Sequence, residues 1–162
     1  MFLFIARHAW AGHLGDPGWP EDSLRELTTE GVERFTSVVQ TLADRGFAPQ
    51  RIATSPYARC RQTAQIIAQH TLASPTVDEL DALAPGSDLP AALAWAAEHE
   101  GQDLCWVGHH PDVGRMTATL IGGERGSIRF AKGSIAAVRL PLPIDSGRGE
   151  LYWHLTAKAL GL

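Results

Sequence analysis

Cysteine is scarce in this chain, with only Cys60 and Cys105 among 162 residues. Neither belongs to a Cys-x-x-Cys pair or to another spacing that is typical of metal ligands. These two positions therefore argue against a disulfide framework and against a structural zinc site. We expect two reduced, largely buried thiols, as is usual for a cytoplasmic protein.

Long apolar segments are also missing from the sequence. No run approaches the roughly 18 residues that a membrane-spanning helix requires. The apolar run at residues 2–6 is shorter than the core of a signal peptide, and no basic segment precedes it. We therefore expect a cytoplasmic protein without a membrane partner.

An excess of positive charge is missing too, because the formal net charge is −4. General nucleic-acid binding requires a basic surface, so we expect no nucleic-acid partner. A local basic pocket remains compatible with this charge. The composition, with 44% hydrophobic and 20% charged residues, is ordinary for a globular protein. Together with the length it favours a single domain over residues 1–162.

Short apolar runs alternate with segments of helical periodicity along most of the chain. Strands are predicted at 2–6, 51–54, 76–77, 103–107, 134–140 and 150–155, and helices at 31–44, 55–69, 89–98 and 111–120. Thr28 is the predicted N-cap of the first helix, and Ser55 with Pro56 is predicted to start the second. This alternation indicates an α/β fold, a three-layer α/β/α sandwich around a mostly parallel central sheet.

Charged side chains gather where three of the predicted strands end. Arg7 and His8 follow the first strand, and Arg59 lies at the start of the helix after the second. His109 follows the strand at 103–107. Ligands of open parallel sheets bind at the carboxyl ends of the strands, so we expect these residues to converge.

The residue types in this cluster favour a phosphoryl ligand. Guanidinium groups match phosphate oxygens in bidentate geometry, and helix amino-termini add free N–H groups. A neutral imidazole at His8 is able to attack phosphorus near pH 7. Since the guanidinium groups stabilise the transferring group electrostatically, this chemistry requires no metal ion and no other cofactor.

Four motifs, in this order, resemble those of the histidine phosphatase superfamily, which includes the phosphoglycerate mutases. They are Arg-His-Ala at 7–9, LRELTTEG at 24–31, SPYARCRQT at 55–63 and VGHHPDVG at 107–114. They span about the first 115 residues, and FAKGSIAAV at 130–138 is similar to the closing strand of small bacterial members. The short chain without an inserted cap most resembles the small SixA-type phosphohistidine phosphatases.

The resemblance implies a role for each matching residue. His8 would be the nucleophile that becomes phosphorylated, and Arg7, Arg59 and His109 would bind the phosphoryl group. Arg25 would lie near the site and contact substrate. The implied activity is that of a phosphatase working through a phosphohistidine intermediate, with a phosphohistidine of a partner protein as substrate.

The sequence departs from the family where a general acid is expected. Aligning the stretch at 78–88 places Ala82 where mutases and many phosphatases have a glutamate. Asp78, Glu79 and Asp81 lie nearby in sequence, but the sequence does not place any of them in the site. Alkoxide leaving groups need a proton, whereas the imidazole of phosphohistidine leaves more readily. A site without a strong acid therefore favours N–P bonds over alkyl phosphoesters.

Other interpretations stay open at this point. The chain could be a phosphatase of small phosphoesters, or a non-catalytic module that binds phosphate or a phosphoprotein. Two site histidines argue against the module, because binding alone needs no nucleophile. A mutase needs a closed site that excludes water, which a chain of this length does not readily provide. A metal site at His8, His13, His109 and His110 is disfavoured because the adjacent arginines would repel a cation.

Several residues near the motifs have two interpretations each. Trp10 and Trp19 follow the proposed nucleophile and either line the pocket or simply pack. His110 either borders the pocket or caps the following helix. Lys132 and Arg129 either steer an anionic substrate or are surface charges, and the second interpretation is favoured.

Overall fold

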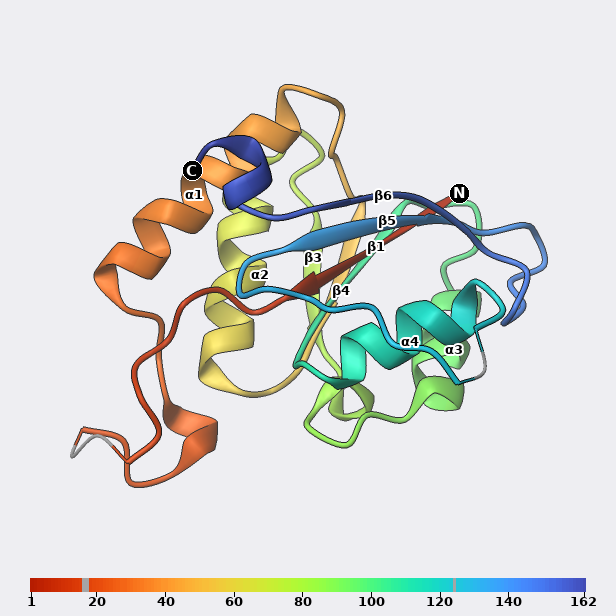
Figure 1. The fold of residues 1–162 in the computed structure, drawn as a ribbon. Helices are drawn as coiled ribbons and strands as arrows, with labels where there is room; N and C mark the ends of the chain where they lie inside the picture. Colours follow the sequence, from red (N-terminus) through yellow and green to blue (C-terminus); the bar gives the residue numbers. More distant parts are fainter. Residues whose placement is uncertain (16–17, 124) are drawn as a thin grey trace.

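Within residues 1–15, 18–123 and 125–162, which the computed structural model describes, six strands form one sheet. They are β1 (Phe2–Arg7), β2 (Arg51–Thr54), β3 (Thr76–Glu79), β4 (Leu104–Gly108), β5 (Ile135–Arg139) and β6 (Glu150–Leu155). Their order in the sheet is β3-β2-β4-β1-β5-β6 (Figure 1). The first four strands run parallel, β5 is antiparallel to β1, and β6 is antiparallel to β5. The mostly parallel sheet predicted from the sequence is therefore confirmed.

Helices cover both faces of this sheet (Figure 1). They are α1 (Thr29–Ala43), α2 (Ala58–His70), α3 (Leu89–Ala97) and α4 (Asp112–Leu120). Short 3-10 helices are η1 (Asp22–Leu24) before α1, η2 (Asp81–Leu83) before α3 and η3 (Lys158–Leu160) after β6. In the described part of the chain, no helix combines the length and the apolar character that crossing a membrane requires.

The side chains of β1 alternate between two separate apolar cores, which fixes the three layers. Phe4 and Ala6 pack in one core with apolar residues of α1 and α2. Leu3 and Ile5 pack in the other core with residues of α3 and α4. This period of two is what an extended strand covered on both faces produces. The predicted α/β/α sandwich is confirmed.

Central and edge strands differ in burial, and this explains their different sequence signals. Every residue of β4 is buried, and Trp106 has no exposed surface. Burial on both faces makes β4 a continuous apolar run that is easily identified. In contrast, β3 lies at the edge of the sheet, and three of its four residues are exposed. Because its exposed residues give only a weak strand signal, the strand predicted at 76–77 covers only half of β3.

The two predicted helix caps have different outcomes. The Thr28 hydroxyl accepts a hydrogen bond from the N–H of Gly31 at 3.0 Å, so the N-cap of α1 is confirmed. The predicted start of the second helix at Ser55 is wrong, because α2 begins at Ala58. The Ser55 hydroxyl instead lies 2.9 Å from Nε2 of His109, a tertiary contact that the local sequence pattern does not reveal.

Candidate active site

The backbone at the carboxyl end of β1 is fixed by both neighbouring segments. Arg7 lies opposite Gly108 in the ladder between β1 and β4. The N–H of His8 donates to the carbonyl of Gly108 at 3.0 Å, and the N–H of Gly133 donates to the carbonyl of His8 at 3.1 Å. Because β2 lies on the other side of β4, the segments after β1, β2 and β4 meet at one edge of the sheet.

Four side chains converge at this edge, as the sequence predicted. The ring centroids of His8 and His109 are 5.4 Å apart, and Nη2 of Arg59 lies 3.2 Å from Nδ1 of His109. The positive charge of Arg7 acts on both imidazoles. His8, Arg59 and His109 are each at least 95% buried. The structure thus brings these four residues together, and their chemical roles are taken up as a proposal below.

The surroundings of His8 select its tautomer and its charge. Nδ1 lies 2.8 Å from the carbonyl oxygen of Ala9, which can only accept a hydrogen bond, so Nδ1 carries the proton. The lone pair of the ring is therefore on Nε2. Burial, reinforced by Arg59, His109 and Arg7, lowers the pKa of His8 to about 3, although the hydrogen bond to Ala9 opposes this change. His8 is consequently neutral near pH 7 and presents an unprotonated Nε2.

His109 is neutral for the same reasons but has the opposite tautomer. Arg59 can only donate, so Nδ1 of His109 accepts from its Nη2. Nε2 of His109 therefore carries the proton and donates to the Ser55 hydroxyl at 2.9 Å. Burial, followed by the charge of Arg59, lowers the pKa of His109 to about 4. The two hydrogen bonds fix the orientation of the ring.

Both arginines keep a buried donor unused within the described part of the chain. Nη1 of Arg7 donates to the carbonyl of Phe130 at 2.9 Å, but its buried Nε has no partner there. Nε of Arg59 is likewise buried without a partner. Leaving a buried donor unpaired costs about 1–3 kcal/mol, and more for a charged group. Two such donors beside neutral imidazoles make a site that favours an anion.

An acidic residue that the sequence analysis did not identify contacts this site. The Asp22 carboxylate accepts from Nη2 of Arg59 at 2.9 Å and from Nη2 of Arg25 at 2.8 Å. Burial raises the pKa of Asp22, but the hydrogen bonds from Arg25 and Arg59 outweigh this effect and hold the pKa below its ordinary value. Asp22 is therefore ionised near pH 7 and unsuited to donate a proton. Its only sequence signal is its position three residues before Arg25.

Arg25 lies beside the predicted site and reaches it through Asp22. Besides its ion pair with Asp22, it donates from Nη1 to the carbonyl of Gly12 at 2.8 Å. These contacts hold the segment after β1 against η1. The structure thus places Arg25 near the four central residues, as predicted, with its guanidinium engaged by the chain itself.

Several side chains of the segment SPYARCRQT (55–63) make contacts that support the site. Beyond Ser55 and Arg59, the Gln62 side chain accepts from the N–H of Leu27 at 2.7 Å and ties the entry of α1 to α2. The Thr63 hydroxyl accepts from the N–H of Ala9 at 3.0 Å and donates to the carbonyl of Arg59 at 2.6 Å. Thr63 thereby links the residue after His8 to the helix that carries Arg59.

The acids considered from the sequence as proton donors are engaged elsewhere or exposed. Asp78 accepts from Nε of Arg51 at 2.7 Å, and this hydrogen bond lowers its pKa despite partial burial. Glu79 pairs with Arg61 at 3.4 Å on the surface. Asp81 lies exposed in η2. None of the three has a contact with His8 or His109 among the interactions of the described residues.

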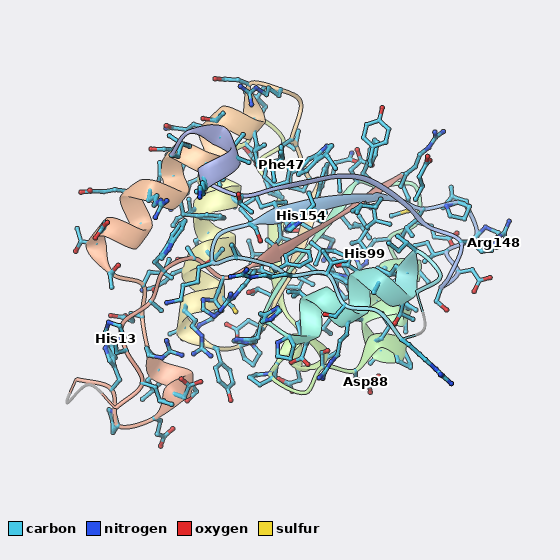
Figure 2. The ribbon with its side chains drawn as sticks, viewed as in Figure 1. His13, Phe47, Asp88, His99, Arg148 and His154 are labelled. Carbon is cyan, nitrogen blue, oxygen red and sulfur yellow. The ribbon has the colours of Figure 1, made fainter. Side chains whose placement is uncertain are left out.

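The surroundings of the site give little support to a thiol nucleophile or to a bound metal ion. The Cys60 thiol lies 3.5 Å from Nε2 of His109, and burial raises its pKa to about 12, so it remains protonated. In residues 1–15, 18–123 and 125–162, no three His, Cys, Asp or Glu side chains cluster in a way that could hold a metal ion. Figure 2 shows His13 in the loop after β1, at the periphery of the molecule.

A pocket of about 690 Å³ adjoins the site through Arg7. Trp10, His110, Arg129 and Lys132 line it, so these residues border a cavity next to the proposed nucleophile. Trp19 lies half-buried in the segment between β1 and η1.

Comparison with known proteins agrees with this geometry. Residues 3–84, about half of the chain, match the family described as Histidine phosphatase superfamily (branch 1). An uncharacterized protein of Picosynechococcus sp. is 36% identical over 143 residues, covering 86% of this chain and 85% of that protein. Phosphohistidine phosphatase SixA of Escherichia coli is 29% identical over 161 residues, covering 96% of this chain and 94% of SixA.

A solved structure of the protein histidine phosphatase SixA complexed with tungstate has a TM-score of 0.86 to this chain. It is 26% identical and covers 99% of both chains. The extent of the likeness excludes a chance match of one motif. The fold, the edge of the sheet at which the side chains converge, and these matches lead to one conclusion: the chain belongs to the histidine phosphatase superfamily.

Proposed function

We propose that this protein is a metal-independent phosphatase that acts through a phosphohistidine at His8. Its preferred substrate would be a phosphohistidine on a partner protein. Arg7, Arg59 and His109 would bind the phosphoryl group, with Arg25 as a more distant contact. Residues 1–162 would form one catalytic domain without an inserted cap.

One observation carries the proposal. His8 presents an unprotonated Nε2 next to two guanidinium groups that each keep a buried, unpartnered Nε–H. A structural histidine would not need the two unused donors beside it. A phosphoryl group would satisfy both arginines and place phosphorus beside the lone pair. A module that only binds phosphate gains nothing from the neutral imidazole.

The first chemical step follows from the tautomer. The lone pair of Nε2 forms a bond to phosphorus while the bond from phosphorus to the leaving nitrogen breaks. Nδ1 keeps its proton and donates it in a hydrogen bond to the Ala9 carbonyl. This hydrogen bond stabilises the positive charge that develops on the ring. Arg7 and Arg59 stabilise the negative charge on the phosphoryl oxygens. The leaving imidazole either departs already protonated or takes a proton from water.

The second step returns the enzyme to its initial state. A water oxygen forms a bond to phosphorus as the bond between phosphorus and Nε2 breaks. The electron pair of that bond returns to Nε2, and the water releases one proton to solvent. Inorganic phosphate then leaves. Both steps need positive charge around phosphorus, and the two guanidinium groups supply it.

The substrate preference follows from the acids near the site. Asp22 is ionised and hydrogen-bonded to two arginines, and Asp78 and Glu79 are paired with other arginines. An alkoxide leaving group would find no ready proton donor among them. Phosphohistidine needs less assistance, because its imidazole leaves as a neutral molecule once protonated. This favours N–P bonds and activated aryl esters over alkyl esters.

Hydrolysis of three substrates in the presence of EDTA tests the proposal. They are a phosphohistidine peptide, para-nitrophenyl phosphate and phosphoserine. The proposal expects turnover of the first two and much slower turnover of phosphoserine, all abolished in His8→Ala. Efficient phosphoserine turnover would favour a phosphatase of small phosphoesters with an acid from another segment. Binding without any turnover would favour the non-catalytic module.

A further inference from the structure

The pocket beside Arg7 is strongly basic although the chain as a whole is acidic. Five cationic residues line it: Arg7, Arg34, Arg129, Lys132 and Lys158. The chain contains 14 lysines and arginines and has a net charge of −4. More than a third of all its cations therefore face one cavity, which we call the basic pocket.

Among the described residues, no acidic side chain is paired with a cation of the basic pocket. In the described part of the chain, no Asp or Glu lines it, and no ion pair includes one of its five cations. Arg34 donates from Nη2 to a main-chain oxygen of Leu162, the last residue of the sequence, at 2.8 Å, and its guanidinium lies over the ring of Trp10. Burial lowers the pKa of Lys132, and the neighbouring charges of Arg7 and Arg25 lower it further.

The shape of the pocket indicates a ligand larger than one phosphoryl group. At about 690 Å³ it extends from the end of β1 to α1, the loop before β5, and η3. Trp10 and Phe130 give it apolar walls beside the cations. An acidic segment of a protein fits this mixture, because its carboxylates complement the cations and its other side chains can pack against the apolar walls.

We propose that the basic pocket binds carboxylate side chains flanking the phosphohistidine of the partner protein. This inference rests on the proposed function, because Arg7 belongs to both the phosphoryl site and the pocket. Phosphoryl group and acidic flank would then occupy neighbouring sites. The pocket would select phosphohistidines in acidic surroundings and accelerate encounter with them through long-range attraction.

Two phosphohistidine peptides that differ only in their flanks test this inference. One has glutamates on both sides of the phosphohistidine, and the other has glutamines. We expect kcat/KM of the wild type to be about tenfold higher for the glutamate peptide at low ionic strength. The preference should shrink as salt is added, because exposed charges are screened.

Variants of the basic pocket test whether it causes the preference for the glutamate peptide. In the double variant Arg129→Gln and Lys132→Gln, the ratio of kcat/KM for the two peptides should fall below about threefold. The matched control is Arg139→Gln with Arg148→Gln, which removes the same charge beside Met1, at the opposite end of β1. Figure 2 shows Arg148 at the far side of the molecule. The control should keep the preference of the wild type, and thermal unfolding checks that both double variants are folded.

The outcomes separate this inference from the proposed function. Equal turnover of both peptides by the wild type would overturn the inference and leave the phosphatase proposal intact. The same holds if the preference survives in the variant at Arg129 and Lys132. Absence of turnover on both peptides and on para-nitrophenyl phosphate would contradict the proposed function and the inference together.

Discussion

The Asp22 carboxylate lies 2.9 Å from Nη2 of Arg59, a guanidinium that is almost completely buried at the candidate site. This contact gives Arg59 a negatively charged partner within the chain. A phosphoryl group binding to Arg59 would meet the charge of Asp22 at close range and be repelled by it. Asp22 and a phosphoryl anion therefore compete for the same arginine.

This competition predicts the effect of Asp22→Asn on anion binding. We expect inorganic phosphate to bind about fivefold more tightly to the variant, equivalent to ~1 kcal/mol, as measured by titration calorimetry. Asp44→Asn, at the exposed end of α1, removes the same charge elsewhere and should leave the affinity unchanged. Weaker phosphate binding to Asp22→Asn would show instead that Asp22 mainly positions Arg59.

The buried neutral histidines predict acid sensitivity of the fold. His8 and His109 have pKa values of about 3 and 4 in the folded protein, below the ordinary value near 6.5 of the unfolded chain. Between those values the unfolded chain binds more protons, so stability rises with pH and falls on acidification. Each histidine should lower the free energy of unfolding by about 2 kcal/mol between pH 7 and pH 5.

Urea unfolding at the two pH values measures this loss. The double variant His8→Asn and His109→Asn should lose less stability than the wild type over the same interval. Equal losses in the two proteins would mean that neither histidine is held neutral by burial.

Thr63 predicts a coupling between stability and catalysis. Its hydroxyl pairs with the N–H of Ala9 and the carbonyl of Arg59, so Thr63→Val leaves a buried N–H without its partner. We expect a loss of about 1–3 kcal/mol in the free energy of unfolding and a lower kcat, because His8 and Arg59 lose their link. Thr63→Ser keeps the hydroxyl and should retain most of both quantities. Equal kcat in Thr63→Val and the wild type would contradict this link.

The sequence predicted the fold well because its signals are local and strong. The alternation of apolar runs and helical periodicity identified every strand that the structure describes, including the fully buried β4. The four residues His8, Arg7, Arg59 and His109 could be placed together because each lies at or shortly after the carboxyl end of a parallel strand. Strands that end at the same edge of a sheet bring such residues into contact.

The contacts that orient the site could not be predicted from the sequence. Ser55 has the pattern of an N-cap, yet its hydroxyl binds His109, which is 54 residues away in sequence. Asp22 lies in a segment rich in glycine and proline, which has no helical or strand periodicity to show where a side chain points. Both contacts depend on tertiary packing, and local patterns do not encode it.

The pairing of nearby acids with arginines predicts a strong dependence on the leaving group. Among aryl phosphates, kcat/KM should fall steeply as the pKa of the phenol rises, and phosphoserine should react at least about 100-fold more slowly than a phosphohistidine peptide. The triple variant Asp78→Asn, Glu79→Gln and Asp81→Asn should change none of these rates by more than about twofold. A large loss of phosphoserine turnover in the triple variant would identify a general acid among the three residues.

Rapid-quench trapping of the phosphorylated protein tests most directly whether the phosphoryl group is transferred to His8. The wild type is mixed with radiolabelled phosphohistidine peptide, quenched in alkali, digested and analysed by mass spectrometry. We expect label that is stable in alkali and labile in acid, located on the peptide containing His8, and absent from His8→Ala. Label on another residue, or turnover that persists in His8→Ala, would contradict transfer to His8.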